Sequence, residues 1–133
     1  MSYLVPSEFV TKMVDAGESK VHMSTRDTLI RGFMAGAILA LAAVFAVTVA
    51  VETGSFLLGS VLFPVGFCML YLMGFDLLTG VFMLTPLALL DKRPGVSTNT
   101  ILRNWGLVFV GNFAGALTVA FMMAFIFTYG FNV

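Results

Sequence analysis

Three long apolar stretches dominate the chain and decide which solvent it can fold in. Residues 32–51 carry no charge, residues 55–90 carry a single one, and residues 101–128 follow a polar loop at 91–100. About 20 apolar residues in a helix are enough to cross the ~30 Å hydrocarbon core of a bilayer. The sequence therefore predicts an all-α integral membrane protein with three transmembrane spans at about these positions.

The composition supports a membrane protein and argues against several other classes. Hydrophobic residues make up 59% of the chain and charged residues only 11%, whereas a soluble domain carries roughly a quarter charged residues. No basic patch with interleaved aromatics suggests a nucleic-acid partner. No nucleophile–base set, phosphate loop or metal-ligand cluster is recognisable. We expect neither an enzyme nor a cofactor or metal, and the lipid bilayer as the surrounding partner.

The basic residues predict the orientation of the spans. They fall into two groups, one before the first span and one around the 91–100 loop: Lys12, Lys20, Arg26, Arg31, and then Lys92, Arg93, Arg103. Because cytoplasmic loops are enriched in Lys and Arg, we expect both groups on the cytoplasmic side. Residues 55–90 then cross only once. Residues 1–31 are predicted to be a cytoplasmic amphipathic segment and residues 32–133 the membrane domain, in a bacterial inner membrane or an organelle envelope.

The middle apolar stretch contains an unusual motif, "GFDLLTG", in which Asp76 stands between Gly74 and Gly80. A carboxylate at bilayer depth costs roughly 2.5–3.5 kcal/mol on insertion scales. Each glycine weakens a helix by about 1 kcal/mol relative to alanine. The coincidence predicts a second span that is broken near 74–80, with half-helices at about Ser55–Met73 and Val81–Leu90.

A break of this kind favours a binding or permeation role. Irregular backbone at membrane depth is tolerated where it is buried in protein or lines a water-filled cavity. The second half-helix would point its positive end into the membrane, close to the hydroxyl of Thr79. Discontinuous helices mark substrate sites near the midplane of transporters. The motif thus suggests a site for a small anion.

Structural roles for the same residues stay open at this point. Asp76 would cap the second half-helix, and Gly74 and Gly80 would be close packing contacts between helices. Asn112 is expected to hydrogen-bond between helices rather than to bind substrate, and Gly111 and Gly115 form a small-residue face that lets helices approach closely.

Two motifs together resemble the formate/nitrite transporter family. "GFDLLTG" is similar to the first signature of that family, and "LRNWGLVFVGNFAGAL" is similar to its third-span pattern. The resemblance covers residues 7–133 and corresponds to the first half of a family member. It implies a channel or transporter for small monovalent anions such as formate, nitrite or bicarbonate. It also implies an aquaporin-like fold of two inverted three-span repeats, and a homopentamer with a pore in each protomer.

The resemblance also assigns roles along the pore. Thr79 would lie on the loop of the broken helix, Leu77 and Leu78 would line the cytoplasmic-side constriction, and Phe67 would face the same narrowing. Phe63 would approach the outer constriction. Leu78 stands where the family usually has phenylalanine, which would alter the width of the constriction. The family's central pore histidine and a fourth-span lysine belong to the second repeat.

Two readings of the chain follow. We expect the N-terminal half of an anion channel, since one inverted repeat does not enclose a pore and pairing with an oppositely oriented copy conflicts with the one-sided charges. The alternative is a non-transporting membrane subunit, or a half-repeat that packs against partner membrane proteins. Asp76 and Thr79 would then be structural only.

Overall fold

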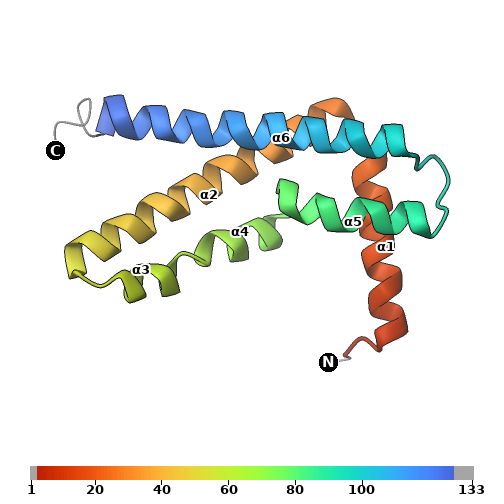
Figure 1. The fold of residues 1–133 in the computed structure, drawn as a ribbon, viewed down its shortest axis with the longest axis horizontal. Helices are drawn as coiled ribbons and strands as arrows, with labels where there is room; N and C mark the ends of the chain where they lie inside the picture. The colour runs from red at the N-terminus through yellow and green to blue at the C-terminus, as the bar shows by residue number, and fades with distance from the viewer. Residues whose placement is uncertain (1–2, 128–133) are drawn as a thin grey trace.

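The computed structural model describes residues 3–127, whose regular elements are all helices with no strand among them, so the all-α prediction is confirmed (Figure 1). The elements are α1 Pro6–His22, α2 Thr25–Thr53, α3 Phe56–Leu62, α4 Val65–Met73, α5 Leu78–Leu90, α6 Thr98–Phe121 and the π-helical η1 Met122–Phe127. Three segments are long and apolar enough to cross a membrane: Thr25–Thr53, Phe56–Met73 and Thr98–Phe125. The protein is an integral membrane protein with three such helices in the described range. The predicted end of the last span, Thr128, lies outside that range.

The helices run back and forth along one long axis (Figure 1). α2 and α6 lie side by side and run in the same direction, while α3, α4 and α5 return in succession, α3 and α4 along α2 and α5 beside α6. α1 crosses the bundle beside α5, at the end where α2 and α6 begin and where the 91–97 loop lies. All seven Lys and Arg therefore lie in α1, in that loop or in the first two turns of α2 and α6.

The helix that contains the first predicted span begins at Thr25, ahead of the span itself. The Oγ of Ser24 accepts a hydrogen bond from the Asp27 N–H at 3.2 Å, which caps the helix start in the usual way. α2 then continues unbroken to Thr53. Residue 32, the predicted start of the membrane domain, thus lies inside α2, and the boundary between residues 31 and 32 stays a prediction.

Backbones approach very closely where glycines face each other across α2 and α6. A Cβ added to Gly36 would lie 2.1 Å from the Asn112 carbonyl oxygen, and one added to Gly115 would lie 2.0 Å from the Phe33 carbonyl oxygen. The α1–α5 crossing is equally tight, since a Cβ on Gly17 would lie 2.0 Å from the Leu84 oxygen. Small residues at such contacts are typical of membrane helix pairs.

The second span is interrupted twice. α3 gives way to α4 at Phe63 and Pro64, where proline has no N–H to donate. α4 ends at Met73, and Gly74 takes the left-handed conformation with φ 73°, which costs glycine little. α5 begins at Leu78. The non-helical residues are therefore 74–77, a shorter stretch than the predicted 74–80, and Gly80 lies in the first turn of α5.

The loop after α5 is held on α1 by Arg93. Its guanidinium pairs with three carboxylates: Asp15 at 2.8 Å, Glu18 at 3.0 Å and Asp91 at 2.7 Å. The hydrogen bond with Asp91, helped by Asp15 and Glu18, raises the pKa of Arg93 above its ordinary value against a smaller opposing effect of desolvation. The contacts connect the 91–97 loop to the middle of α1 and so help to position α1 beside α5.

Candidate functional site

A cavity of about 350 Å³ lies where the interrupted span meets α1. Its lining comes from α1, α4, α5 and the non-helical residues 74–77. Six predicted site residues line it: Phe67, Gly74, Asp76, Leu77, Thr79 and Gly80. Most of the lining is apolar, and the polar side chains in it are Lys20, Tyr71, Asp76 and Thr79.

Asp76 is buried and ion-paired instead of capping α5. The residue is 2% exposed, and its Oδ1 accepts from the ammonium of Lys20 in α1. Its Oδ2 has no hydrogen-bond partner among residues 3–127. The N-cap position of α5 is Leu77, which offers no side-chain oxygen. The capping role considered for Asp76 is therefore wrong, because the carboxylate points toward α1.

Two cations at the break were not among the predicted site residues. Lys20 lines the cavity from α1, and Arg31 of α2 donates from Nη1 to the Gly74 carbonyl oxygen at 3.0 Å. The need of a buried acid for a partner signalled that one of the seven cations would be close. Neither cation lies in an apolar run of the sequence, so hydrophobicity alone does not single them out.

Asn112 of α6 holds both sides of the break. Its Oδ1 accepts from the Leu78 N–H at 2.8 Å, which satisfies a first-turn donor of α5. Its Nδ2 donates to the Asp76 carbonyl oxygen at 3.0 Å and to the Gly32 carbonyl oxygen at 2.8 Å. A side chain from a distant helix thus performs the capping that the local sequence of α5 lacks, and joins α2, α6 and the break.

The Asn112 contacts make a testable prediction. Asn112→Leu should lower the free energy of unfolding by about 2–3 kcal/mol, because the partly buried Leu78 N–H and two carbonyl oxygens would lose their partner. Asn112→Asp should be at least as destabilising, since a carboxylate still accepts from Leu78 but repels the two carbonyls. Thermal unfolding in detergent, followed by circular dichroism, measures both. Equal stability of the wild type and Asn112→Leu would contradict the capping role.

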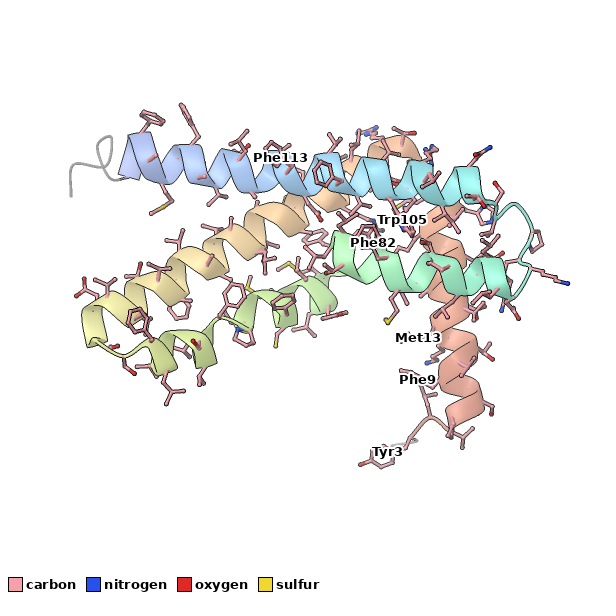
Figure 2. The ribbon with its side chains drawn as sticks, viewed as in Figure 1. Tyr3, Phe9, Met13, Phe82, Trp105 and Phe113 are labelled. Atoms are coloured by element: carbon pink, nitrogen blue, oxygen red, sulfur yellow. The ribbon has the colours of Figure 1, made fainter. Side chains whose placement is uncertain are left out.

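The second half-helix is attached to α6 by an aromatic contact (Figure 2). The rings of Phe82 in α5 and Trp105 in α6 meet edge to face with centroids 4.8 Å apart. The Trp105 Nε1–H donates to the Thr85 Oγ1 at 2.9 Å and to the Val81 carbonyl oxygen at 3.2 Å. These contacts keep the first turns of α5 in place beside the cavity.

The predicted constriction residues do not all meet at the cavity. Phe67 and Leu77 line it, and Leu77 also packs against the buried cluster of Ala35, Ile38 and Leu70. Leu78 is outside the lining, as is Phe63, which contacts Phe67 edge to face at 5.8 Å between centroids. Gly111 and Gly115 lie in the α2–α6 contact described above.

This arrangement suits noncovalent handling of a small anion. α5 begins at the cavity with the positive end of its helix dipole. The N–H groups of Leu78, Gly80 and Val81 already have acceptors. The first turn also presents the Thr79 hydroxyl to the cavity, where it makes no side-chain hydrogen bond within residues 3–127. The Lys20 ammonium lies in the same lining. Within that range, no group of three or more His, Cys, Asp or Glu side chains is arranged to hold a metal ion.

Comparison with known proteins decides the family. The sequence model that describes the formate/nitrite transporter family matches residues 7–132 of this chain. The chain belongs to the formate/nitrite transporter family. This family is one of membrane transporters, in agreement with the prediction of a transport protein. No significant match to a solved structure is found.

Individual relatives extend the comparison. The chain is 33% identical over 127 residues to the uncharacterized transporter YrhG of Bacillus subtilis, covering 91% of this chain and 47% of the relative. It is 32% identical to the formate channel BtFdhC of Bacillus thuringiensis, covering 91% and 48%. A probable formate transporter of Methanothermobacter thermautotrophicus is 30% identical, covering 92% and 47%. The chain spans about half the length of the curated relatives that it matches.

Proposed function

We propose that this chain supplies one wall of a transmembrane pore for small monovalent anions such as formate or nitrite. The observation that carries the proposal is the cavity at the break, where Thr79, the start of α5 and the Lys20–Asp76 ion pair meet a mostly apolar lining. Apolar constrictions beside a few polar groups are typical of selective pores. Relatives named as formate channels support this substrate class.

In this proposal the predicted residues have distinct roles. Phe67 and Leu77 form the apolar narrowing, and the Thr79 hydroxyl donates to the passing anion. Phe63 supports the ring of Phe67 from the neighbouring turn. Leu78 acts through its backbone N–H, which is held by Asn112, and the left-handed Gly74 allows the chain to leave α4.

A further set of spans would have to close the cavity on its open side. Tyr71 is 81% exposed and Met83 60% exposed although both line it, and a Cβ on Gly80 would meet nothing within 4 Å. We propose that an inverted three-span unit, in the same polypeptide or in a different subunit, covers these residues. We further propose a homopentamer in a bacterial inner membrane or an organelle envelope. The clustering of Lys and Arg at the α1 end supports a cytoplasmic N-terminus.

Replacing the Thr79 hydroxyl tests the pore. In proteoliposomes, Thr79→Val should reduce formate flux about tenfold or more, because a hydrogen bond to a charged group contributes roughly 1.5–3 kcal/mol. The matched control is Thr118→Val, whose hydroxyl donates only to the Ala114 carbonyl oxygen of its own helix at 2.8 Å. That variant should keep wild-type flux. Unchanged flux in Thr79→Val, with equal protein in the vesicles, would leave Thr79 a structural role only.

A further inference from the structure

We propose that the surface between α2 and α6 binds an anionic phospholipid, with one acyl chain in an apolar groove and the phosphate at Arg26 and Arg103. The groove, called the α2–α6 groove below, has a volume of about 330 Å³. Its walls include Ile30, Phe33 and Met34 of α2 and Val110, Gly111 and Ala114 of α6. None of its lining residues belongs to the cavity at the break.

The chemistry of the α2–α6 groove fits a hydrocarbon chain. Every side chain that lines it is apolar, so a water molecule in it would find none of the polar partners that it needs. Gly111 makes its floor, where the α2 and α6 backbones touch, since a Cβ there would lie 2.9 Å from the Leu29 carbonyl oxygen. Ile30 is 49% exposed and Val110 56% exposed, so the groove is accessible from the surface.

Two arginines continue the same helix faces toward the membrane surface. Arg26 precedes Ile30 by one turn, and Arg103 precedes Val110 by two turns, so each lies on the groove side of its helix. Between Arg103 and the groove stands Gly106, beside which a Cβ would meet nothing within 4 Å. A lipid whose acyl chain lies in the groove can therefore extend to the arginines without meeting a side chain at position 106.

The arginines form a cationic site at the end of the groove. Arg103 donates from Nη2 to the Oγ1 of Thr25, which precedes Arg26 in the first turn of α2, so the start of α2 lies within reach of Arg103. Neither arginine makes an ion pair with a residue between 3 and 127. One acid, Asp27, lies in the same turn of α2. Two cations and one anion leave a net charge of plus one, and guanidinium groups match the geometry of phosphate oxygens.

Charge complementarity favours a lipid over a second copy of the chain as the occupant. All seven Lys and Arg precede residue 32 or lie between residues 92 and 103. A neighbouring copy in the same orientation would therefore bring further cations to this level of the membrane. An anionic lipid brings a negative charge to the depth of the arginines and an acyl chain to the depth of the groove.

Lipid titration of the purified full-length protein in detergent tests the proposal. Native mass spectrometry compares phosphatidylglycerol with phosphatidylcholine of the same acyl chains. Each arginine near a membrane surface contributes about fivefold in affinity for anionic lipid. Arg26→Gln should lower phosphatidylglycerol affinity about fivefold, and Arg26→Gln with Arg103→Gln about twenty-five-fold, without weakening phosphatidylcholine. The control Lys92→Gln removes an exposed cation at the same end of the bundle. It should change the affinity for phosphatidylglycerol less than twofold.

A second variant tests the groove without touching the charges. Ala114→Phe fills the α2–α6 groove and should weaken both lipids at least fivefold while the arginines stay in place. Should the double arginine variant fold poorly, the lipid affinity of Arg26→Gln alone decides, because Arg26 is exposed and its side chain makes no hydrogen bond or ion pair within the described part of the chain. If Arg26→Gln and Lys92→Gln lower the affinity for phosphatidylglycerol equally, the proposed site is wrong, and the lipid binds through the general positive charge of the surface. A changed oligomer with unchanged lipid affinity in Ala114→Phe would assign the groove to contact between copies.

Discussion

Gly36→Ala is expected to destabilise the bundle by about 2–3 kcal/mol, although alanine is the better helix former. The new Cβ would lie 2.1 Å from the carbonyl oxygen of Asn112 and 2.8 Å from its Cα. Both are backbone atoms, so no side-chain rotation relieves the clash and α2 must move away from α6. Overpacking costs typically 1–3 kcal/mol, and the higher end applies when two backbones separate. The same displacement moves Asn112 from the break, so anion flux should fall together with stability.

Gly106→Ala is the matched control on α6. Nothing lies within 4 Å of a Cβ at that position, so the substitution should be neutral or should stabilise the protein by up to about 1 kcal/mol through helix propensity. Gly115→Ala should repeat the effect of Gly36→Ala, because its Cβ would lie 2.0 Å from the Phe33 carbonyl oxygen. Thermal unfolding in detergent compares the three. Similar melting temperatures for Gly36→Ala and Gly106→Ala would mean that α2 and α6 do not touch through their backbones.

The helical spans were predictable because the bilayer leaves few choices. A backbone in hydrocarbon must satisfy its own hydrogen bonds, so an apolar run long enough to cross becomes a helix. The three predicted spans accordingly match three long apolar helices. The helix ends were less predictable. Ser24 sets the start of α2 through a local cap, but the start of α5 depends on Asn112, 34 residues further along the chain.

The partner of Asp76 illustrates the limit of sequence reasoning at the site. That a buried acid needs a cation follows from elementary electrostatics, but seven Lys and Arg were available. Lys20 reaches Asp76 because α1 lies against α5, and this contact requires Gly17 to approach the backbone at Leu84. Such a crossing of two helices far apart in the sequence leaves no periodic signal. The roles of Thr79 and Phe67 in transport remain predictions.

The second large effect is expected from Lys20→Met, which removes the partner of a buried charge. Asp76 has a side chain only 1% exposed, whereas that of Lys20 is 18% exposed. An unpaired buried charge costs about 3–5 kcal/mol, so Lys20→Met should destabilise the protein by an amount in that range. Asp76→Asn should cost less, because the orphaned lysine can turn toward water. Thermal unfolding in detergent measures both variants.

A double-mutant cycle separates the ion pair from other effects at these positions. Lys20→Met combined with Asp76→Asn should recover much of the stability lost in Lys20→Met, because no unpaired buried charge is left. Lys12→Met is the control on the same helix, since Lys12 is exposed and makes no ion pair within residues 3–127. It should leave stability unchanged. If the losses of the two single variants simply add in the double variant, Lys20 and Asp76 are not coupled, and α1 is held to the break by the Gly17 contact rather than by charge.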